Sequence, residues 1–195
     1  MPNYIRPRRP GAMIFFTVCL ADHQQSLLTD HIKILREAVR YTKQRRPFGI
    51  LAWVVLPDRM HAVWKMPKTD ANYSQRWGMI KARFSKHIRM FEGAPPVPRH
   101  GSAGGVNPAL RKGEAGIWQK RFWEHHIRDA QDLSACIHAC HIAPVTQGLV
   151  GAPELWPFSS MHRDRRRRGE ECRAGLTPPL PARGGVNPAL RGLPA

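Results

Sequence analysis

Two apolar, strand-like runs separated by a short turn constrain the fold of this chain more than any other feature. Residues 48–56 (FGILAWVVL) and 61–66 (HAVWKM) are rich in β-branched and aromatic side chains. Pro57 and Asp58 stand between the two runs, and a Pro-Asp pair is typical of tight turns. The sequence therefore predicts an antiparallel β-hairpin.

Three more segments show a regular apolar pattern before residue 92. Residues 12–20 (AMIFFTVCL) form a short apolar run, which predicts a buried central strand. Apolar side chains recur every three or four residues over 28–39 and again over 73–88. This spacing places them on one face of a helix, so two amphipathic helices are predicted, the second with a strongly basic outer face.

The second half of the chain supplies two further elements. Residues 117–128 (IWQKRFWEHHIR) are strand-like, and residues 131–143 predict a helix that ends at Pro144. The order strand, helix, strand, strand, helix, strand, helix predicts an α+β fold. We expect a ferredoxin-like sandwich, with an antiparallel sheet and its helices on one face.

We expect one domain over residues 1–162, followed by a disordered basic tail over 163–195. Both the tail and a predicted irregular loop at about 92–116 are rich in Pro, Gly and Arg and lack a hydrophobic period. The octapeptide GGVNPALR occurs at 104–111 and again at 184–191. Because a repeat fold needs at least about three contiguous copies, we interpret these two as a trace of repetitive DNA.

The charge balance predicts an acidic partner. The chain carries 31 Lys and Arg against 14 Asp and Glu, a formal net charge of +17. Nucleic acid is the usual partner of such a surplus, although a merely soluble basic protein is an alternative. No apolar run is long enough to span a membrane, and the four cysteines are too irregularly spaced for a disulfide framework. A reducing cytoplasm is therefore expected.

Residues 53–64 (WVVLPDRMHAVW) resemble the signature strand of the REP-associated tyrosine transposases, whose centre reads P-[DN]-H-x-H. The resemblance continues in the same order at 4–18, at 73–84 (YSQRWGMIKARF), at 116–129 (GIWQKRFWEHHIRD) and at 144–160. It covers most of residues 4–162. It implies an IS200-like fold of the HUH endonuclease class, in which two histidines hold Mg²⁺ or Mn²⁺ and a tyrosine on a helix attacks a DNA phosphate.

The positions that would carry this chemistry are replaced here. Arg59 stands at the first histidine position of the strand motif, so that only His61 remains. Aligning the helix on the Pro and Gly that follow it places Ala139 at the family's nucleophile position. Ala143 falls at the position of a polar residue that can help hold the metal. Guanidinium and methyl groups are neither metal ligands nor nucleophiles, so we expect impaired cleavage.

Several residues allow more than one interpretation. His61 is either a vestigial metal ligand or a histidine packed on the sheet, and Arg59 could contact a phosphate directly. The cysteines and histidines of 136–141 have zinc-ligand character, but they crowd into one predicted helix, so we do not predict zinc there. The predicted DNA-contacting residues are basic or aromatic: Arg76, Lys81, Arg83, Lys86, Lys120, Arg121, Trp123, His125, Arg128, Arg165 and Arg166.

The main hypothesis is a transposase-like protein of the bacterial cytoplasm, associated with the nucleoid. It would bind single-stranded or hairpin DNA of repetitive extragenic palindromes, as a monomer or homodimer, with impaired nicking. Two alternatives remain: a DNA- or RNA-binding module that needs no metal, and the product of a decaying gene without function.

Overall fold

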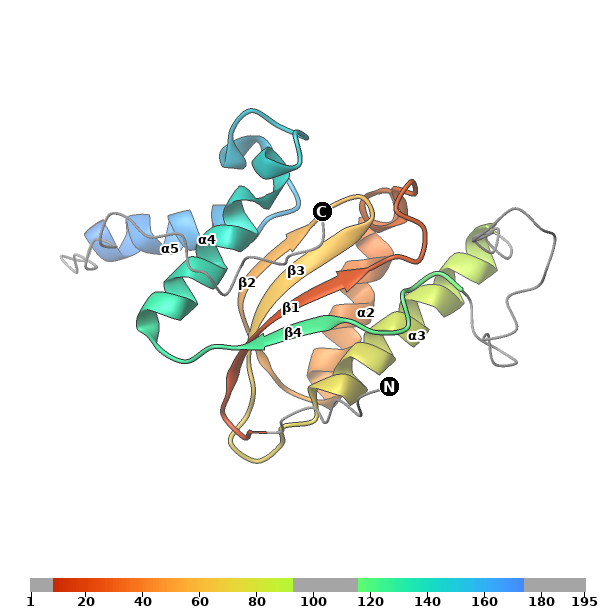
Figure 1. Cartoon of the computed structure of the whole chain (residues 1–195), viewed down its shortest axis with the longest axis horizontal. Helices are drawn as coiled ribbons and strands as arrows, with labels where there is room; N and C mark the ends of the chain where they lie inside the picture. The colour runs from red at the N-terminus through yellow and green to blue at the C-terminus, as the bar shows by residue number, and fades with distance from the viewer. Residues whose placement is uncertain (1–8, 93–115, 174–195) are drawn as a thin grey trace, which may run out of the picture.

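The computed structural model describes residues 9–92 and 116–173, which form an α+β structure around one antiparallel sheet. The four strands lie in the spatial order β2-β3-β1-β4 (Figure 1), which is the ferredoxin-like order. They are β1 (Met13–Cys19), β2 (Gly49–Val55), β3 (Arg59–Lys65) and β4 (Trp123–His126). The predicted fold class is confirmed.

Five α-helices and one short 3₁₀ helix accompany the sheet in the described residues. They are α1 (Leu27–Asp30), α2 (Ile32–Arg45), α3 (Tyr73–Glu92), α4 (Ala130–Thr146), η1 (Pro153–Leu155) and α5 (Met161–Arg173). None of these helices combines the length and the apolar character needed to cross a bilayer.

The predicted hairpin is present as β2 and β3. The two strands pair antiparallel, with one register shift between Ile50 and Ala52, and the turn lies at Pro57-Asp58. Strand β1 pairs with β3 on one side and with β4 on the other, so the predicted central strand is confirmed. This pairing places Thr17 of β1 directly opposite His61 of β3.

One face of the sheet carries an aromatic core beneath α2 and α3. Phe16 and Trp64 point from the sheet into this layer, and α3 contributes Tyr73 and Trp77. The Trp64 and Trp77 rings stack with centroids 4.2 Å apart at an interplanar angle of 16°. Both indoles are at most 1% exposed. Burial of such large rings makes this layer the principal source of stability.

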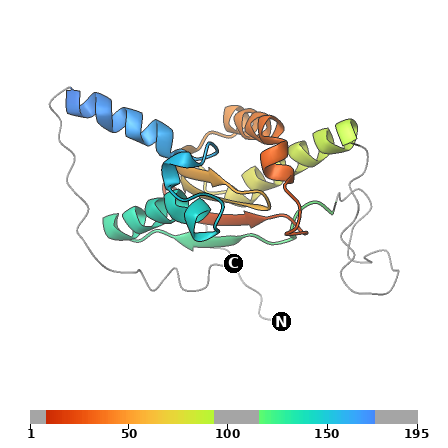
Figure 2. The same cartoon turned by 90° about the horizontal axis from the view of Figure 1, so that it is seen from above.

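Helix α4 covers the opposite face, which adds a layer to the predicted arrangement of helices on one face (Figures 1 and 2). The strands are apolar on both sides: Phe15, Val54 and Val63 point away from the aromatic core and pack against α4. A sheet with two apolar faces needs a cover on each.

The predicted helix end at Pro144 is wrong, because α4 continues to Thr146 and the chain turns at Gly148, where φ is +67°. The amide of Pro144 cannot donate to the carbonyl one turn earlier. Ala143 and Pro144 are both buried. We attribute the continuation to this burial, which offsets one missing hydrogen bond in the last turn.

The prediction of a disordered basic tail from residue 163 is wrong for its first residues, because α5 extends over Met161–Arg173. The start of α5 is held against the edge strand: Val54 pairs with Ser159, and the Arg163 guanidinium donates to the carbonyls of Ile50 and Leu51 at 3.3 and 2.8 Å. The rest of that predicted tail and most of the predicted loop, with both GGVNPALR segments, lie outside the described residues.

Candidate functional site

The HUH-like motif lies at the beginning of β3, on the face that α4 covers. Alternate residues of β3 point to opposite faces of the sheet. Met60, Ala62 and Trp64 belong to the aromatic core, whereas Val63 packs toward α4. Arg59 and His61 therefore share the α4 side, as the spacing of a metal-binding pair requires.

Arg59 is held in a buried ion pair with its neighbour Asp58. The Arg59 Nη2 atom lies 2.9 Å from Asp58 Oδ2, and its Nε lies 3.1 Å from both carboxylate oxygens. Both side chains are less than 10% exposed. Because the guanidinium already pairs with a carboxylate, it is a structural cation more than a group ready to receive a phosphate.

His23 completes this cluster from the chain segment after β1. Its Nδ1 atom lies 2.5 Å from Asp58 Oδ2 and 3.4 Å from Arg59 Nη2. Burial alone would raise the pKa of Asp58, but the hydrogen bonds with Arg59 and His23 outweigh it and lower the pKa. Asp58 is thus ionised at neutral pH and balances the Arg59 charge.

His61 is a neutral, packed histidine. Its Nδ1 atom lies 2.9 Å from the Thr17 hydroxyl oxygen, and its ring stacks on Phe15 at 5.7 Å and 13°. Burial, and next the positive charge of Arg59, lower the pKa of His61 to about 4. Of the two interpretations of His61, its contacts favour a histidine packed on the sheet.

Helix α4 presents an apolar face to the sheet. Cys136 and Cys140 are fully buried and Ala143 is 7% exposed, whereas Ala139 is half-buried. At Ala139 and Ala143, the positions predicted to correspond to the family's nucleophile and polar ligand, this helix offers only methyl groups.

These residues do not fit the divalent cation that the HUH motif implies. Of the three expected ligand positions, the first holds a buried cation, the third holds an alanine, and that of His61 alone offers an electron pair. The nearby Asp58 carboxylate is already taken up by Arg59 and His23. A dication placed beside the Arg59 guanidinium would be repelled by it, and a single imidazole cannot offset its lost hydration.

Arg76, a predicted DNA contact, is buried in the structure and does not lie on the surface. Its side chain is 1% exposed and donates to the carbonyls of Arg46, Asn72 and Pro47 at 2.9 to 3.2 Å. Arg76 also pairs with Asp70 at 2.9 Å. The guanidinium therefore fastens the beginning of α3 to the segment after α2, and its position on the apolar side of α3 could not be seen from charge alone.

The remaining predicted DNA contacts fall into two groups. The first group is half-buried and already contacts other parts of the protein. Its members are Lys81, which donates to the Gln119 carbonyl, Arg83, which contacts Tyr41 and Glu37, Trp123, which packs on Phe15, and His125, which bonds to Asp132. Exposed are Lys86, Lys120, Arg121, Arg128, Arg165 and Arg166. Lys120 and Arg121 precede edge strand β4 and Arg128 follows it, so exposed cations flank both ends of this strand.

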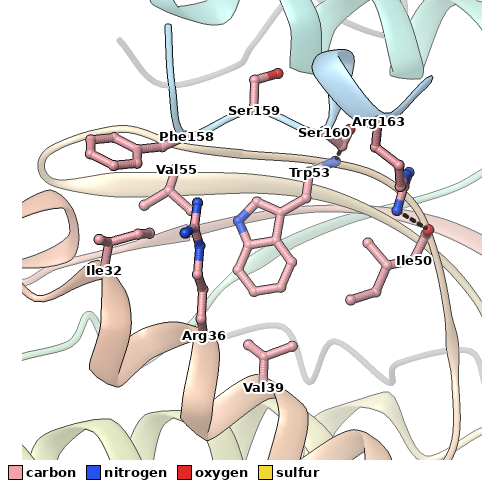
Figure 3. Close-up of a pocket in the computed structure, with 10 residues that line it drawn as sticks. All are labelled: Ile32, Arg36, Val39, Ile50, Trp53, Val55, Phe158, Ser159, Ser160 and Arg163. Atoms are coloured by element: carbon pink, nitrogen blue, oxygen red, sulfur yellow. Dashed lines mark hydrogen bonds between the residues drawn. The ribbon is translucent and has the colours of Figure 1, made fainter. Parts of the chain in front are cut away.

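A groove of about 240 Å³, which no sequence pattern predicted, lies on the α2 side of edge strand β2 (Figure 3). It is lined by Trp53, Phe158 and aliphatic side chains, and the Arg36 side chain extends alongside the Trp53 indole. An aromatic ring beside a cation can stack a base and contact a phosphate. No sequence signal joined these residues, because the segment at 158–163 meets β2 only in the folded chain.

No family model matches the chain, but individual proteins do. The chain is 38% identical over 167 residues to the REP-associated tyrosine transposase of Escherichia coli strain K12. This match covers 86% of the chain and 87% of the relative. The chain is 37% identical over 164 residues to a Haemophilus influenzae protein of the same name, covering 84% of this chain and 88% of the relative.

A solved structure is similar over nearly the whole chain. It is that of a REP-associated tyrosine transposase bound to a REP hairpin, with a TM-score of 0.72 and 36% identity. The match covers 96% of this chain and 94% of the other. The likeness thus extends over nearly the whole fold.

Proposed function

The chain belongs to the REP-associated tyrosine transposases, and from this membership we propose that it binds hairpin DNA of repetitive extragenic palindromes but is impaired in nicking it. The substrate class is that of the structurally similar relative, whose structure contains a REP hairpin. The proposed impairment rests on this chain's own residues.

The observation that carries the proposal is the buried Arg59–Asp58 pair at the position of the metal site. In an active member, a cation held there would polarise the scissile phosphate, and a tyrosine would form the covalent link. Here an internal ion pair takes up the space, and Ala139 supplies no hydroxyl. We therefore propose that Mg²⁺ or Mn²⁺ is not held at Arg59 and His61.

DNA binding would depend on exposed cations elsewhere on the surface. The exposed cations that flank β4 are Lys120, Arg121 and Arg128, and Lys86 adds another on α3. Contacts between such side chains and phosphates release counterions and need no metal. We infer that hairpin binding and nicking are separable in this chain, which would act on nucleoid DNA of the cytoplasm as a monomer or homodimer.

The test is the affinity of the purified chain for a fluorescently labelled REP-type hairpin, measured by anisotropy with Mn²⁺ and then with a chelator. A scrambled single strand of equal length is the matched control DNA. We expect hairpin affinity to exceed that for the control and to change less than about twofold on chelation. Loss of hairpin binding with the chelator would contradict the proposal, as would equal affinity for both DNAs.

A further inference from the structure

Three ligand-type side chains meet where β4 joins α4, away from Arg59 and His61. His125 lies on β4, and Asp132 and Cys136 lie one turn apart on α4. One potential ligand atom from each residue lies within 4.8 Å of the other two. This is the one such group of three among residues 9–92 and 116–173.

Helix α4 and strand β4 each position part of this group of three residues. Asp129 caps α4 by accepting from the backbone N–H of Asp132 at 2.8 Å, which fixes the first turn. Asp132 and Cys136 are four residues apart, so their side chains lie on the same helix face. His125 projects toward them from the strand, its ring parallel to Trp123 at 6.0 Å and 10°.

The spacing is close to that of tetrahedral coordination. His125 Nε2 lies 2.8 and 3.0 Å from the two Asp132 oxygens, and Cys136 Sγ lies 3.8 Å from Asp132 Oδ1. With zinc–ligand bonds of about 2.0 to 2.3 Å, neighbouring ligand atoms stand roughly 3.3 to 3.8 Å apart. The sulfur–oxygen distance already fits, and the nitrogen–oxygen distance needs to open by about half an ångström.

Burial and charge agree with a cation at this point. Cys136 is fully buried and Asp132 is 4% exposed, whereas the side chain of His125 is 15% exposed. The Asp132 carboxylate lies beside the Cys136 sulfur and supplies negative charge for a cation, which on binding would displace the thiol proton. The Arg128 side chain lies 3.6 Å from Asp132 Oδ2 and is 70% exposed, so it can turn into solvent. The Arg128 backbone N–H also donates to Oδ2 at 3.1 Å, which leaves Oδ1, the oxygen near both His125 and Cys136, for the cation.

We propose that His125, Asp132 and Cys136 form a binding site for a borderline divalent cation of the Zn²⁺ type, with solvent as the fourth ligand. Nitrogen and sulfur ligands favour zinc over Mg²⁺ or Mn²⁺, which prefer oxygen. Phe15 lies between the two regions, with its ring 5.7 Å from His61 and 5.8 Å from Trp123. Zinc here would tie α4 to the sheet, independently of DNA.

The test uses Co²⁺ as a spectroscopic substitute for zinc. The full-length chain is stripped of metal, titrated with Co²⁺, and scanned for visible bands and for thiolate-to-cobalt charge transfer. We expect saturation at a single equivalent, displacement by Zn²⁺, and loss of the charge-transfer band in Cys136→Ser. The matched control is Cys140→Ser, which alters a fully buried thiol one turn further along the same helix and should keep the band.

The affinity for Zn²⁺, measured by competition with a chromophoric chelator, gives a second readout. Loss of an outer partner of a metal site costs about 10- to 100-fold in affinity, so loss of a ligand should cost at least about 100-fold. His125→Ala, a change at a more exposed position, tests the site should Cys136→Ser fail to fold. Absence of the charge-transfer band, equal losses in the control, or unchanged affinity in His125→Ala would each overturn the proposal.

Discussion

The two faces of the sheet differ in what their side chains do. The face beneath α2 and α3 is a complete aromatic core, in which Phe16, Trp64 and Trp77 contact one another. The face beneath α4 carries Arg59 and Ala139, at the positions where we propose that the family's catalytic side chains have been replaced. Both faces are well packed, so the replacements did not leave the sheet uncovered.

This difference indicates which constraints act on each face. A large ring in the aromatic core cannot be lost without a cavity, whereas a metal ligand can be replaced if its charge is balanced. Asp58 balances the Arg59 charge, and Thr17 and Phe15 pack against His61, whose burial and nearby Arg59 charge keep it neutral. Around Arg59 and His61 the α4 face is therefore held by structural contacts, in agreement with the proposed loss of the metal site.

The largest effect is expected from truncating the aromatic core. Trp77→Ala should lower the free energy of unfolding by about 4 kcal/mol, because it removes a stacked, 1% exposed indole. Urea unfolding followed by fluorescence and circular dichroism measures this, and Met90→Ala, at a position 71% exposed on the same helix, is the control. A change below about 1 kcal/mol would contradict the comparison. A wild-type chain without a cooperative transition would favour the decaying-gene hypothesis.

Breaking the Arg59–Asp58 ion pair on the α4 face should lower the free energy of unfolding by somewhat less. Asp58→Ala leaves the Arg59 guanidinium buried without its carboxylate, which should lower the free energy of unfolding by roughly 3 kcal/mol. The double variant Asp58→Asn with Arg59→Met removes both charges and should remain within about 1 kcal/mol of wild type. Equal losses in the single and double variants would show that the pairing of charges is not what stabilises this site.

The lowered pKa of His61 should make the free energy of unfolding depend on pH. Between pH 6.5 and about 4 the unfolded histidine binds a proton that the folded one excludes, so stability falls as pH decreases through this window and stays level below it. The loss is up to about 3 kcal/mol. Urea unfolding across this window should show a flatter profile for His61→Gln than for wild type. His138→Gln, at an exposed position on α4, should leave the profile unchanged.

The smallest effect concerns the cations that flank β4. Lys120→Ala with Arg121→Ala should weaken hairpin binding and reduce the slope of log affinity against log salt by roughly 1.4 to 1.8 units, because each phosphate contact contributes about 0.7 to 0.9. Lys33→Ala with Lys43→Ala removes the same charge from exposed positions of α2 and should change the slope less. Equal reductions would mean that net charge alone, and not the β4 edge, governs binding.

Local patterns predicted the fold well and the surroundings of the site poorly. The hairpin at Pro57-Asp58 and the central strand followed from apolar runs and turn chemistry, and both are present. The burial of Arg76 and the meeting of His125 with Asp132 and Cys136 depend on contacts between elements, which spacing along one element does not reveal. The continuation of α4 through Pro144 also followed from tertiary burial outweighing a local rule.

The most direct test of the central claim is a cleavage assay with labelled single-stranded hairpin DNA and Mn²⁺, resolved on a denaturing gel. The unaltered chain is compared with a double variant that restores Arg59→His and Ala139→Tyr, after both are shown to bind the hairpin. We predict intact DNA with the unaltered chain and nicked, protein-linked DNA with the double variant. Cleavage by the unaltered chain would contradict the claim that this member has kept its scaffold and lost its chemistry.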